Sequence, residues 1–332
     1  MNPMSVRLAL IVVTLMIAVQ LVARAQTFIP VDVSGAAHTR PVSINNSGEV
    51  TGTYEDGAGT HGFLRDAAGF ITTFDVPGAA GTFPASINSH GEITGYYLDG
   101  TASQAGFFRD RAGSINTFGG GFVPLVPTSI NPKAEITGYS PSTFFQQGFV
   151  WDAKNGLTFF SIPGITHVFP FSINSAGEIA GAAHDGTTTS AFVRNTKGAT
   201  TLFDVPGADA TIATSINAAG KTTGLFFVGV GLGSFVRSAR GELETFSVPE
   251  GFTDTVAVSI NNSGDVTGHY TTGFSIPPSE QRGFLRDSNG SLTTFHVDGA
   301  SDTVPQSINS RREITGYYII GGTAHGFVRS AK

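Results

Sequence analysis

One tripeptide, Ser-Ile-Asn, recurs seven times along this chain of 332 residues, and its spacing constrains the fold more than any other feature. Successive copies lie 43, 43, 43, 43, 44 and 48 residues apart. We number the repeats 1 to 7 by their first residues, which are Ser43, Ser86, Ser129, Ser172, Ser215, Ser259 and Ser307. A period in the low forties with about four short strands per unit is typical of a β-propeller, whereas solenoid repeats of similar length are helical and would show a 3.6-residue period.

Each repeat divides into four expected strands, which we call a to d. Strand a runs into Ser-Ile-Asn, strand b reads approximately Glu-Ile-Thr-Gly-Tyr-Tyr, strand c Gly-Phe-x-Arg and strand d Thr-Phe-Asp-Val. Asn, Asp and Gly between these segments favour tight turns. By analogy with other propellers, we expect strand a to be innermost and strand d outermost.

The two ends of the chain complement each other. Repeat 7 stops at Lys332, soon after its strand c, while residues 31–37 match residues 74–80 of repeat 1 position by position. Residues 26–42 therefore supply the missing part of repeat 7. The sequence predicts an all-β fold: a single seven-bladed β-propeller of four-stranded blades over residues 26–332, whose N-terminal strand completes the last blade, closes the ring and removes exposed strand edges.

Residues 1–25 have the pattern of a signal peptide. Arg7 provides a positive charge, an apolar run extends over residues 8–22, and Ala23 and Ala25 place small residues at the two cleavage positions. The run is short for a membrane span, and an uncleaved membrane anchor is the alternative. We expect cleavage before Gln26 and a secreted or periplasmic protein with no membrane span in the mature chain.

Charge and motif content exclude several classes of protein. The formal net charge is −6 and no basic patch is present, which argues against nucleic acid as a partner. The chain has no cysteine, so neither disulfides nor thiol chemistry contribute. It also lacks a zinc-helix motif, a phosphate-binding Gly-Lys-Ser/Thr loop, a Gly-x-Ser-x-Gly elbow and an EF-hand loop. We expect no cofactor, although a bound divalent cation is compatible with the acidic residues described below.

Two features recur in most repeats, and we interpret both as structural. The Asn of Ser-Ile-Asn opens a turn that ends in Gly, as at residues 45–48, because Asn bonds to its own backbone and Gly tolerates positive φ. An acid at the start of strand b and an Arg at the end of strand c, such as Glu49 and Arg65, are expected to face each other across a hairpin. Such a pair stabilises the hairpin by at most about 1 kcal/mol.

Loop variation indicates which face carries function. The b–c and d–a loops hold the length exceptions and most of the sequence variation, and alternate connections of a meander emerge on the same face. Function tends to reside on variable loops over a rigid frame. We therefore predict that these two loop sets form the functional face.

Four residues expected on that face break the repeat symmetry. Five residues before the serine, repeats 6, 7 and 1 carry Asp254, Asp302 and His38, and these repeats are neighbours in a closed ring. Two residues further on, repeat 1 has Arg40 where every other repeat is apolar. Together they can bind a cation, an anion or a sugar at the channel mouth, or perform acid–base chemistry. The alternative is that they are solvated loop residues.

Aromatic residues of repeat 3 provide a second candidate site. Strand c carries the only tryptophan, Trp151, and the b–c loop carries Phe144 and Phe145. Exposed aromatic rings stack on sugars, which would make these residues ligand-binding, but such residues also complete a core. Elsewhere, the apolar b–c loop of repeat 5 (residues 226–231) is a candidate inter-chain contact, and the long b–c loop of repeat 6 (residues 271–282) can overhang the mouth.

The repeat unit is similar to that of a known bacterial family. Ile-Asn-x-x-Gly-x-Ile-x-Gly is followed by His-Gly-Phe at residues 61–63 and 325–327, or by Ala-Phe at residues 191–192, and then by Thr-Phe-x-Val-Pro-Gly-Ala. This unit resembles the "probable extracellular repeat" family, often called HAF repeats, over the whole mature chain. The resemblance implies an exported repeat protein and brings no catalytic residues with it.

Three function classes remain open. The first is a non-catalytic, monomeric binding propeller outside the cytoplasm that recognises a glycan, a polymer or a protein on the b–c and d–a loop face. Low charge, regular repeats and the lack of a catalytic motif favour this class. The second is an extracytoplasmic enzyme (a lyase, lactonase or hydrolase) that acts at the channel mouth through Asp254, Asp302, His38 and Arg40, which rests on fold analogy alone. The third is a structural component of the envelope or matrix.

Overall fold

The computed structural model describes residues 27–330 except residues 102, 122, 142–145, 250–253 and 274–279. The described residues form 28 strands and no helix, which confirms the all-β prediction. The described residues therefore contain no helix that is long and apolar enough to cross a membrane. The expected signal peptide, residues 1–25, lies outside the described residues.

The inner two strands of each repeat follow the predicted order. Strand a is β2 (His38–Ile44), β6 (Gly81–Ile87), β10 (Val126–Ile130), β14 (His167–Ile173), β18 (Ala210–Ile216), β22 (Thr255–Ile260) and β26 (Asp302–Ile308). Strand b is β3 (Val50–Glu55), β7 (Ile93–Leu98), β11 (Ile136–Ser140), β15 (Ile179–His184), β19 (Thr222–Val228), β23 (Val266–Thr272) and β27 (Ile314–Ile320).

The outer two strands complete each sheet. Strand c is β4 (Thr60–Arg65), β8 (Gln104–Arg109), β12 (Gln147–Asp152), β16 (Thr189–Arg194), β20 (Gly231–Arg237), β24 (Glu280–Arg286) and β28 (Thr323–Ser330). Strand d is β5 (Ile71–Phe74), β9 (Ile115–Phe118), β13 (Gly156–Phe160), β17 (Thr200–Phe203), β21 (Leu243–Phe246), β25 (Leu292–Phe295) and β1 (Thr27–Val31).

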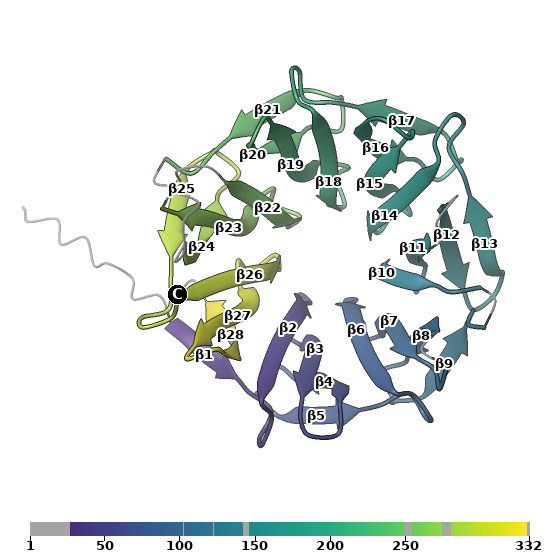
Figure 1. Ribbon diagram of the computed structural model, residues 1–332, viewed down its shortest axis with the longest axis vertical. Helices are drawn as coiled ribbons and strands as arrows, with labels where there is room; N and C mark the ends of the chain where they lie inside the picture. The colour runs from purple at the N-terminus through teal and green to yellow at the C-terminus, as the bar shows by residue number, and fades with distance from the viewer. Residues whose placement is uncertain are drawn as a thin grey trace, which may run out of the picture.

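The strands of a repeat pair antiparallel in the order a to d, as in β2-β3-β4-β5. A single parallel pair between Thr189 and Ala210 joins the sheets of repeats 4 and 5. In repeat 7, residues 27–31 of β1 pair antiparallel with residues 326–330 of β28, so the first strand of the chain is the outer strand of the last sheet. The sheets are arranged around a central opening, with strand a of each repeat on the inside (Figure 1).

An irregularity in strand a explains the glycine that recurs in strand b. In repeat 1 the register of β2 and β3 shifts between Pro41 and Ser43. A Cβ atom on Gly52, which lies opposite Pro41, would come within 2.2 Å of the carbonyl oxygen of Arg40. Only glycine fits such a close backbone approach, and the other six repeats have the same shift and the same glycine.

The charged pair expected between strands b and c is replaced by two other contacts. Glu49 accepts a hydrogen bond from Asn45 Nδ2 at 2.6 Å. The arginine of strand c instead lies over the phenylalanine of strand d in the preceding repeat, with Arg329 Cζ 4.3 Å from the ring centroid of Phe295. The same stacking occurs in repeats 2, 4, 5 and 6. These arginines therefore join neighbouring sheets through cation–π contacts rather than stabilising their own hairpin.

The Ser-Ile-Asn tripeptide also links each sheet to the next. Each Asn donates from Nδ2 to the backbone carbonyl of the Asn in the following repeat at 2.9 to 3.1 Å. Each Ser Oγ accepts the backbone N–H of the following repeat's Ile at 3.2 to 3.4 Å. Across the chain ends, the links run from Asn309 to Asn45 and from Ile44 to Ser307.

The same asparagine holds its own turn. Asn45 Oδ1 accepts the backbone N–H groups of Ser47 and Glu49, both at 3.0 Å. One buried amide thus satisfies backbone groups of two sheets, which agrees with the structural interpretation of the tripeptide.

Candidate functional site

The innermost strands present alternate residues to the central channel. Because successive side chains of a strand point to opposite faces, the residues one and three positions before each serine face inward together. We call the end of the channel with the b–c and d–a loops the loop face, and the end with the a–b turns the turn face. The two ends differ in chemistry.

A cavity of about 560 Å³ lies within the channel. Its lining is mainly apolar and comes from repeats 2 to 7, including Tyr96, Val126, Phe171, Ile212, Leu225 and Val258. Thr128 and Thr214 also line it, but their hydroxyls donate to backbone carbonyls of the next repeat at 2.9 Å. The cavity therefore presents few free polar groups to a ligand.

Aromatic rings pack against one another on one side of the channel. Phe83 and Tyr96 stack with centroids 4.7 Å apart and ring planes 7° apart. Tyr139 and Phe169 of the next two repeats meet edge to face at 5.4 Å. The tyrosines stand ten residues after the serine, on strand b, a position that the sequence analysis did not consider as part of the channel.

Three of the four residues predicted at the mouth serve first as joints between sheets. Asp254 Oδ1 accepts the backbone N–H of Leu232 at 3.1 Å, and Asp302 Oδ1 accepts that of Gln281 at 3.0 Å. His38 Nδ1 accepts the backbone N–H of Ala324 at 3.1 Å. In each case the donor lies on strand c of the preceding repeat. The side chain five residues before the serine thus accepts a backbone N–H group that the neighbouring sheet leaves unpaired.

The fourth residue, Arg40, has its own countercharge. Its guanidinium pairs with Glu55, which lies on β3 of the same repeat. Arg40 also lies close enough to Tyr317 to favour the phenolate of that residue. Burial and the charge of Asp302 outweigh this effect and raise the pKa of Tyr317, so the phenol stays protonated at neutral pH.

His269 is the residue of this site that the sequence analysis missed. It lies on β23, ten residues after the serine of repeat 6, in the position that Tyr96 and Leu225 hold in the cavity wall. Its imidazole is half-buried, and its Nδ1 is inaccessible and has no hydrogen-bond partner among the described residues. Burial lowers its pKa, and the nearby charges of Asp254 and Asp302 offset this only in part. A neutral imidazole thus lies near both carboxylates.

A signal for His269 exists in the sequence. The seven residues at its position are Thr53, Tyr96, Tyr139, Ala182, Leu225, His269 and Tyr317, so histidine occurs there once. Comparing every inward-facing position across the repeats would have identified it.

The site does not offer an evident metal centre. Among the described residues, no group of three or more His, Asp or Glu side chains is arranged to hold a metal ion. The divalent cation that the acidic residues suggested thus finds no ligand set in this part of the chain.

The prediction that Trp151 stacks on a ligand is wrong. Its side chain is 9% exposed and stacks on Phe118 of the preceding repeat, with centroids 4.5 Å and planes 11° apart. Trp151 occupies the place of the strand c arginine and makes the same contact with the neighbouring sheet. Phe144 and Phe145 lie outside the described residues.

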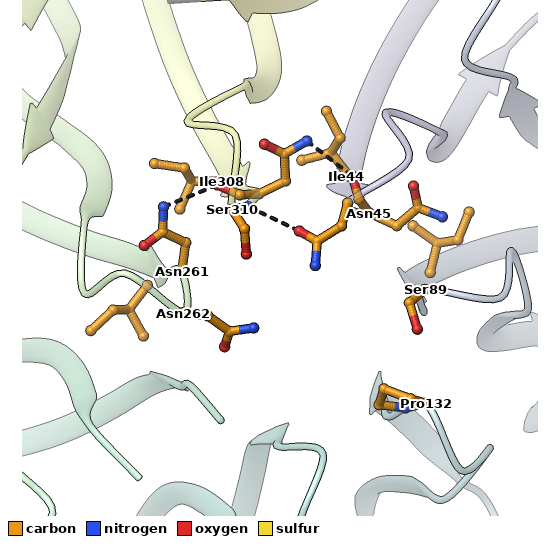
Figure 2. A pocket seen from close by; sticks show the side chains of 12 residues that line it. Ile44, Asn45, Ser89, Pro132, Asn261, Asn262, Ile308 and Ser310 are labelled. Carbon is orange, nitrogen blue, oxygen red and sulfur yellow. Dashed lines mark hydrogen bonds between the residues drawn. The ribbon is translucent and has the colours of Figure 1, made fainter. Parts of the chain in front are cut away.

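The turn face carries a small neutral pocket of about 190 Å³. It is lined by the Ser-Ile-Asn segments and by polar turn residues such as Asn46, Asn262 and Ser310 (Figure 2). Asn46 Oδ1 accepts the backbone N–H of Ser310 at 2.9 Å, and Asn262 does the same for Ala218 at 3.0 Å. These side chains are engaged in joints between repeats, so the loop-face end of the channel is the better candidate site.

Comparison with known proteins identifies the fold class. No protein-family model and no curated protein matches the sequence. Among solved structures, virginiamycin B lyase from Staphylococcus aureus is similar with a TM-score of 0.61 and 13% identity, covering 92% of this chain and 99% of that one. A catalytically inactive variant of that lyase, with quinupristin, gives 0.61 and 14% over 92% and 100%. The β-propeller domain of the Trilobed protease from Pyrococcus furiosus gives 0.60 and 9% over 90% and 95%.

Identities this low indicate a shared fold and nothing of activity. The chain is a β-propeller protein.

Proposed function

We propose that this protein is an exported, non-catalytic binding propeller whose ligand enters the channel from the loop face. The observation that carries the proposal is the cavity of about 560 Å³ with its mainly apolar lining. Val258 and Gln306 of this lining lie on β22, which directly follows Asp254, and on β26, which begins with Asp302. Pockets of roughly 300 to 1,000 Å³ with apolar walls and a few polar groups are typical of ligand sites.

The proposal includes a seven-bladed ring, closed by β1, that acts as a monomer. Seven copies of Ser-Ile-Asn, the pairing of β1 with β28 and the hydrogen bond from Asn309 to Asn45 support a closed ring of seven blades. The pattern of residues 1–25 supports export. The motifs that resemble the extracellular repeat family support the same location, and we propose membership of that family.

The lining of the cavity favours one ligand class, a protein or polymer that inserts an apolar group, and disfavours a glycan. A sugar ring would bring hydroxyls into a space where the hydroxyls of Thr128 and Thr214 already donate to backbone carbonyls. Burying unpaired hydroxyls is unfavourable by about 1–3 kcal/mol each.

The test is binding of the neutral apolar dye N-phenyl-1-naphthylamine to the mature chain, residues 26–332. We expect one saturable site that Val258→Trp abolishes by filling the cavity, with Leu225→Trp as a second variant from another repeat. The matched control is Val230→Asp, since Val230 is fully exposed on the b–c tip of repeat 5. Melting curves establish that each variant is folded. No saturable site, or loss of binding only in the Val230 variant, would contradict the proposal.

One observation favours an enzyme as the second candidate function. The Nδ1 atom of His269 has no hydrogen-bond partner among the described residues, and burial lowers the pKa of this imidazole, which makes it a suitable proton acceptor near two carboxylates. Groups with shifted pKa values in a cleft mark catalytic sites more often than chance. A lyase, lactonase or hydrolase would use His269 as base, with Asp254 and Asp302 orienting or stabilising its protonated form. His269→Gln should then abolish turnover of any lactone, ester or peptide substrate found by screening, while dye binding persists. Unchanged turnover in that variant would exclude this role.

A further inference from the structure

Charges at the loop-face mouth do not cancel. Arg40 pairs with Glu55, and Arg282 pairs with Glu280 at 3.0 Å, so both arginines already have carboxylate partners. Asp254 has no ion pair among the described residues and accepts only the backbone N–H of Leu232.

Asp302 is in the same situation as Asp254. It accepts the backbone N–H of Gln281 and, at 3.0 Å, the hydroxyl of Ser301, and it too has no cationic partner in the described part of the chain. Hydrogen bonds from neutral donors stabilise a carboxylate but leave its charge uncompensated. Two negative charges thus remain at one side of the mouth.

The nearest titratable side chain does not supply the missing positive charge. The negative charges of Asp254 and Asp302 both act to raise the pKa of His269, yet burial keeps this pKa below the ordinary value for histidine. Tyr317 is held protonated and neutral. The two carboxylates, which are partly exposed, thus have no cationic partner among the described residues and can accept one from a ligand. Because no group of three or more His, Asp or Glu side chains among these residues is arranged to hold a metal ion, the site suits an organic cation better.

The cavity supplies the other half of the recognition. Tyr96 and Phe171 line it together with the aliphatic side chains of Val126, Ile212 and Leu225. Apolar walls favour an apolar body, and aromatic rings also tolerate a neighbouring cation through their negative faces. Val258 and Gln306 of the lining lie on β22 and β26, and Asp254 and Asp302 stand at the loop-face ends of these two strands. A ligand that extends along these strands from the cavity would therefore approach the two carboxylates.

We propose that the channel binds an amphipathic organic cation, with its apolar body in the cavity and its ammonium or guanidinium group at Asp254 and Asp302. This inference rests on the proposed function, because it names the ligand class of the same site. The carboxylates would bind the positive end of the ligand at the loop face, and the cavity wall near Tyr96 and Val258 would contact its apolar body.

Three matched probes test the ligand class by calorimetry on the mature chain at low salt. They are 4-phenylbutylamine, 4-phenylbutanol and 4-phenylbutyrate, which share one apolar body and carry a positive, neutral or negative end. We expect the amine to bind about tenfold more tightly than the alcohol, a difference of about 1.4 kcal/mol, and the carboxylate to bind least. Since the preference is electrostatic, added salt should reduce it.

Variants assign the preference to particular groups. Asp254→Asn with Asp302→Asn retains oxygens that accept the backbone N–H groups, and should reduce amine binding to the level of the alcohol without changing alcohol binding. Asp209→Asn is the matched control, because Asp209 is a loop-face carboxylate of repeat 5 that bonds to the N–H of Gly229. It should leave the amine preference unchanged.

The outcomes separate this inference from the proposed function. Equal or tighter binding of the carboxylate, or an amine preference that survives the double variant, would overturn the inference. Binding of the naphthylamine dye with no binding of the amine would overturn the inference and leave the binding propeller intact. Failure of the dye and of all three probes would overturn both.

Discussion

Two a–b turns carry a residue other than glycine at the same left-handed position, and only one of these residues forms an ion pair. Five residues after the serine, five repeats have glycine at positive φ, whereas repeats 3 and 7 have Ala134 at φ 57° and Arg312 at φ 63°. A side chain in this left-handed region is unfavourable by about 1–2 kcal/mol, and glycine loses about 0.4–1 kcal/mol through unfolded-state entropy. Ala134→Gly is therefore expected to stabilise the fold by up to about 1 kcal/mol.

The same substitution in repeat 7 should have the opposite sign. Arg312 donates from Nε and Nη2 to Asp265 at 2.9 and 2.8 Å, and Asp265 is fully buried. Breaking a buried pair is unfavourable by about 3–5 kcal/mol, but Arg312 is 45% exposed and Asn261 and Ser288 also donate to Asp265, so we reduce this to about 2–3 kcal/mol. Because the relief of backbone strain offsets part of this loss, Arg312→Gly should destabilise the fold by about 1–2 kcal/mol.

Equilibrium urea unfolding at pH 7 measures both values, and lower pH separates their causes. Burial alone would raise the pKa of Asp265, but hydrogen bonds from Arg312 and Asn261 outweigh it and hold the pKa below the ordinary value. The ion pair thus contributes stability above the ordinary carboxyl pKa of about 4, and this contribution is lost as pH falls through the lower folded-state pKa. The deficit of Arg312→Gly should shrink below about pH 4, while the effect of Ala134→Gly should not change. Equal stabilisation by both substitutions would refute the reasoning.

Three further results are expected. Asn174→Ala removes both a turn cap and the hydrogen bond to the next repeat, and should reduce the free energy of unfolding by about 2–4 kcal/mol in urea, more than a surface substitution does. Burial lowers the pKa of His61, but Asp75 and Asp56 outweigh this effect and raise the pKa above 6.5. An NMR titration of Asp75→Asn should show a lower pKa for His61. The stability that the contact provides should be lost as pH rises through the folded-state pKa. Deleting residues 27–33 uncovers the edge of β28 and should abolish cooperative melting or cause aggregation, so a truncated chain that melts like the intact one would contradict the role of β1.

The repeat was sufficient to predict the strands, because strand order and turns depend on local sequence. The match between the two ends of the chain likewise predicted the pairing of β1 with β28. Contacts between sheets were harder to predict from the sequence. The register of strands b and c was needed to see that the arginine column packs on the preceding sheet, and the same contact explains why Trp151 is buried rather than exposed.

The candidate site was predicted in part. Departures from the repeat at the innermost strand located Asp254, Asp302, His38 and Arg40 at the loop-face end, but their hydrogen bonds to the neighbouring strand c were not visible in the sequence. His269 was missed because strand b was not examined for inward-facing positions. Asp254 lies beside the paired strand of the same repeat, whereas the proximity of His269 to Asp302 depends on how repeats 6 and 7 pack, which no single repeat encodes.

One carboxylate can both accept a hydrogen bond from the neighbouring sheet and bind a ligand, because it has two oxygens. Asp254 uses Oδ1 for the backbone N–H of Leu232, and its Oδ2 has no partner among the described residues. Asparagine can preserve the first contact and remove the charge, whereas alanine removes both. If Asp254 acts only as a joint, Asp254→Asn should behave as wild type in stability and in binding of every probe. If it also meets a cation, Asp254→Asn should keep the stability and weaken the amine preference, and Asp254→Ala should reduce both.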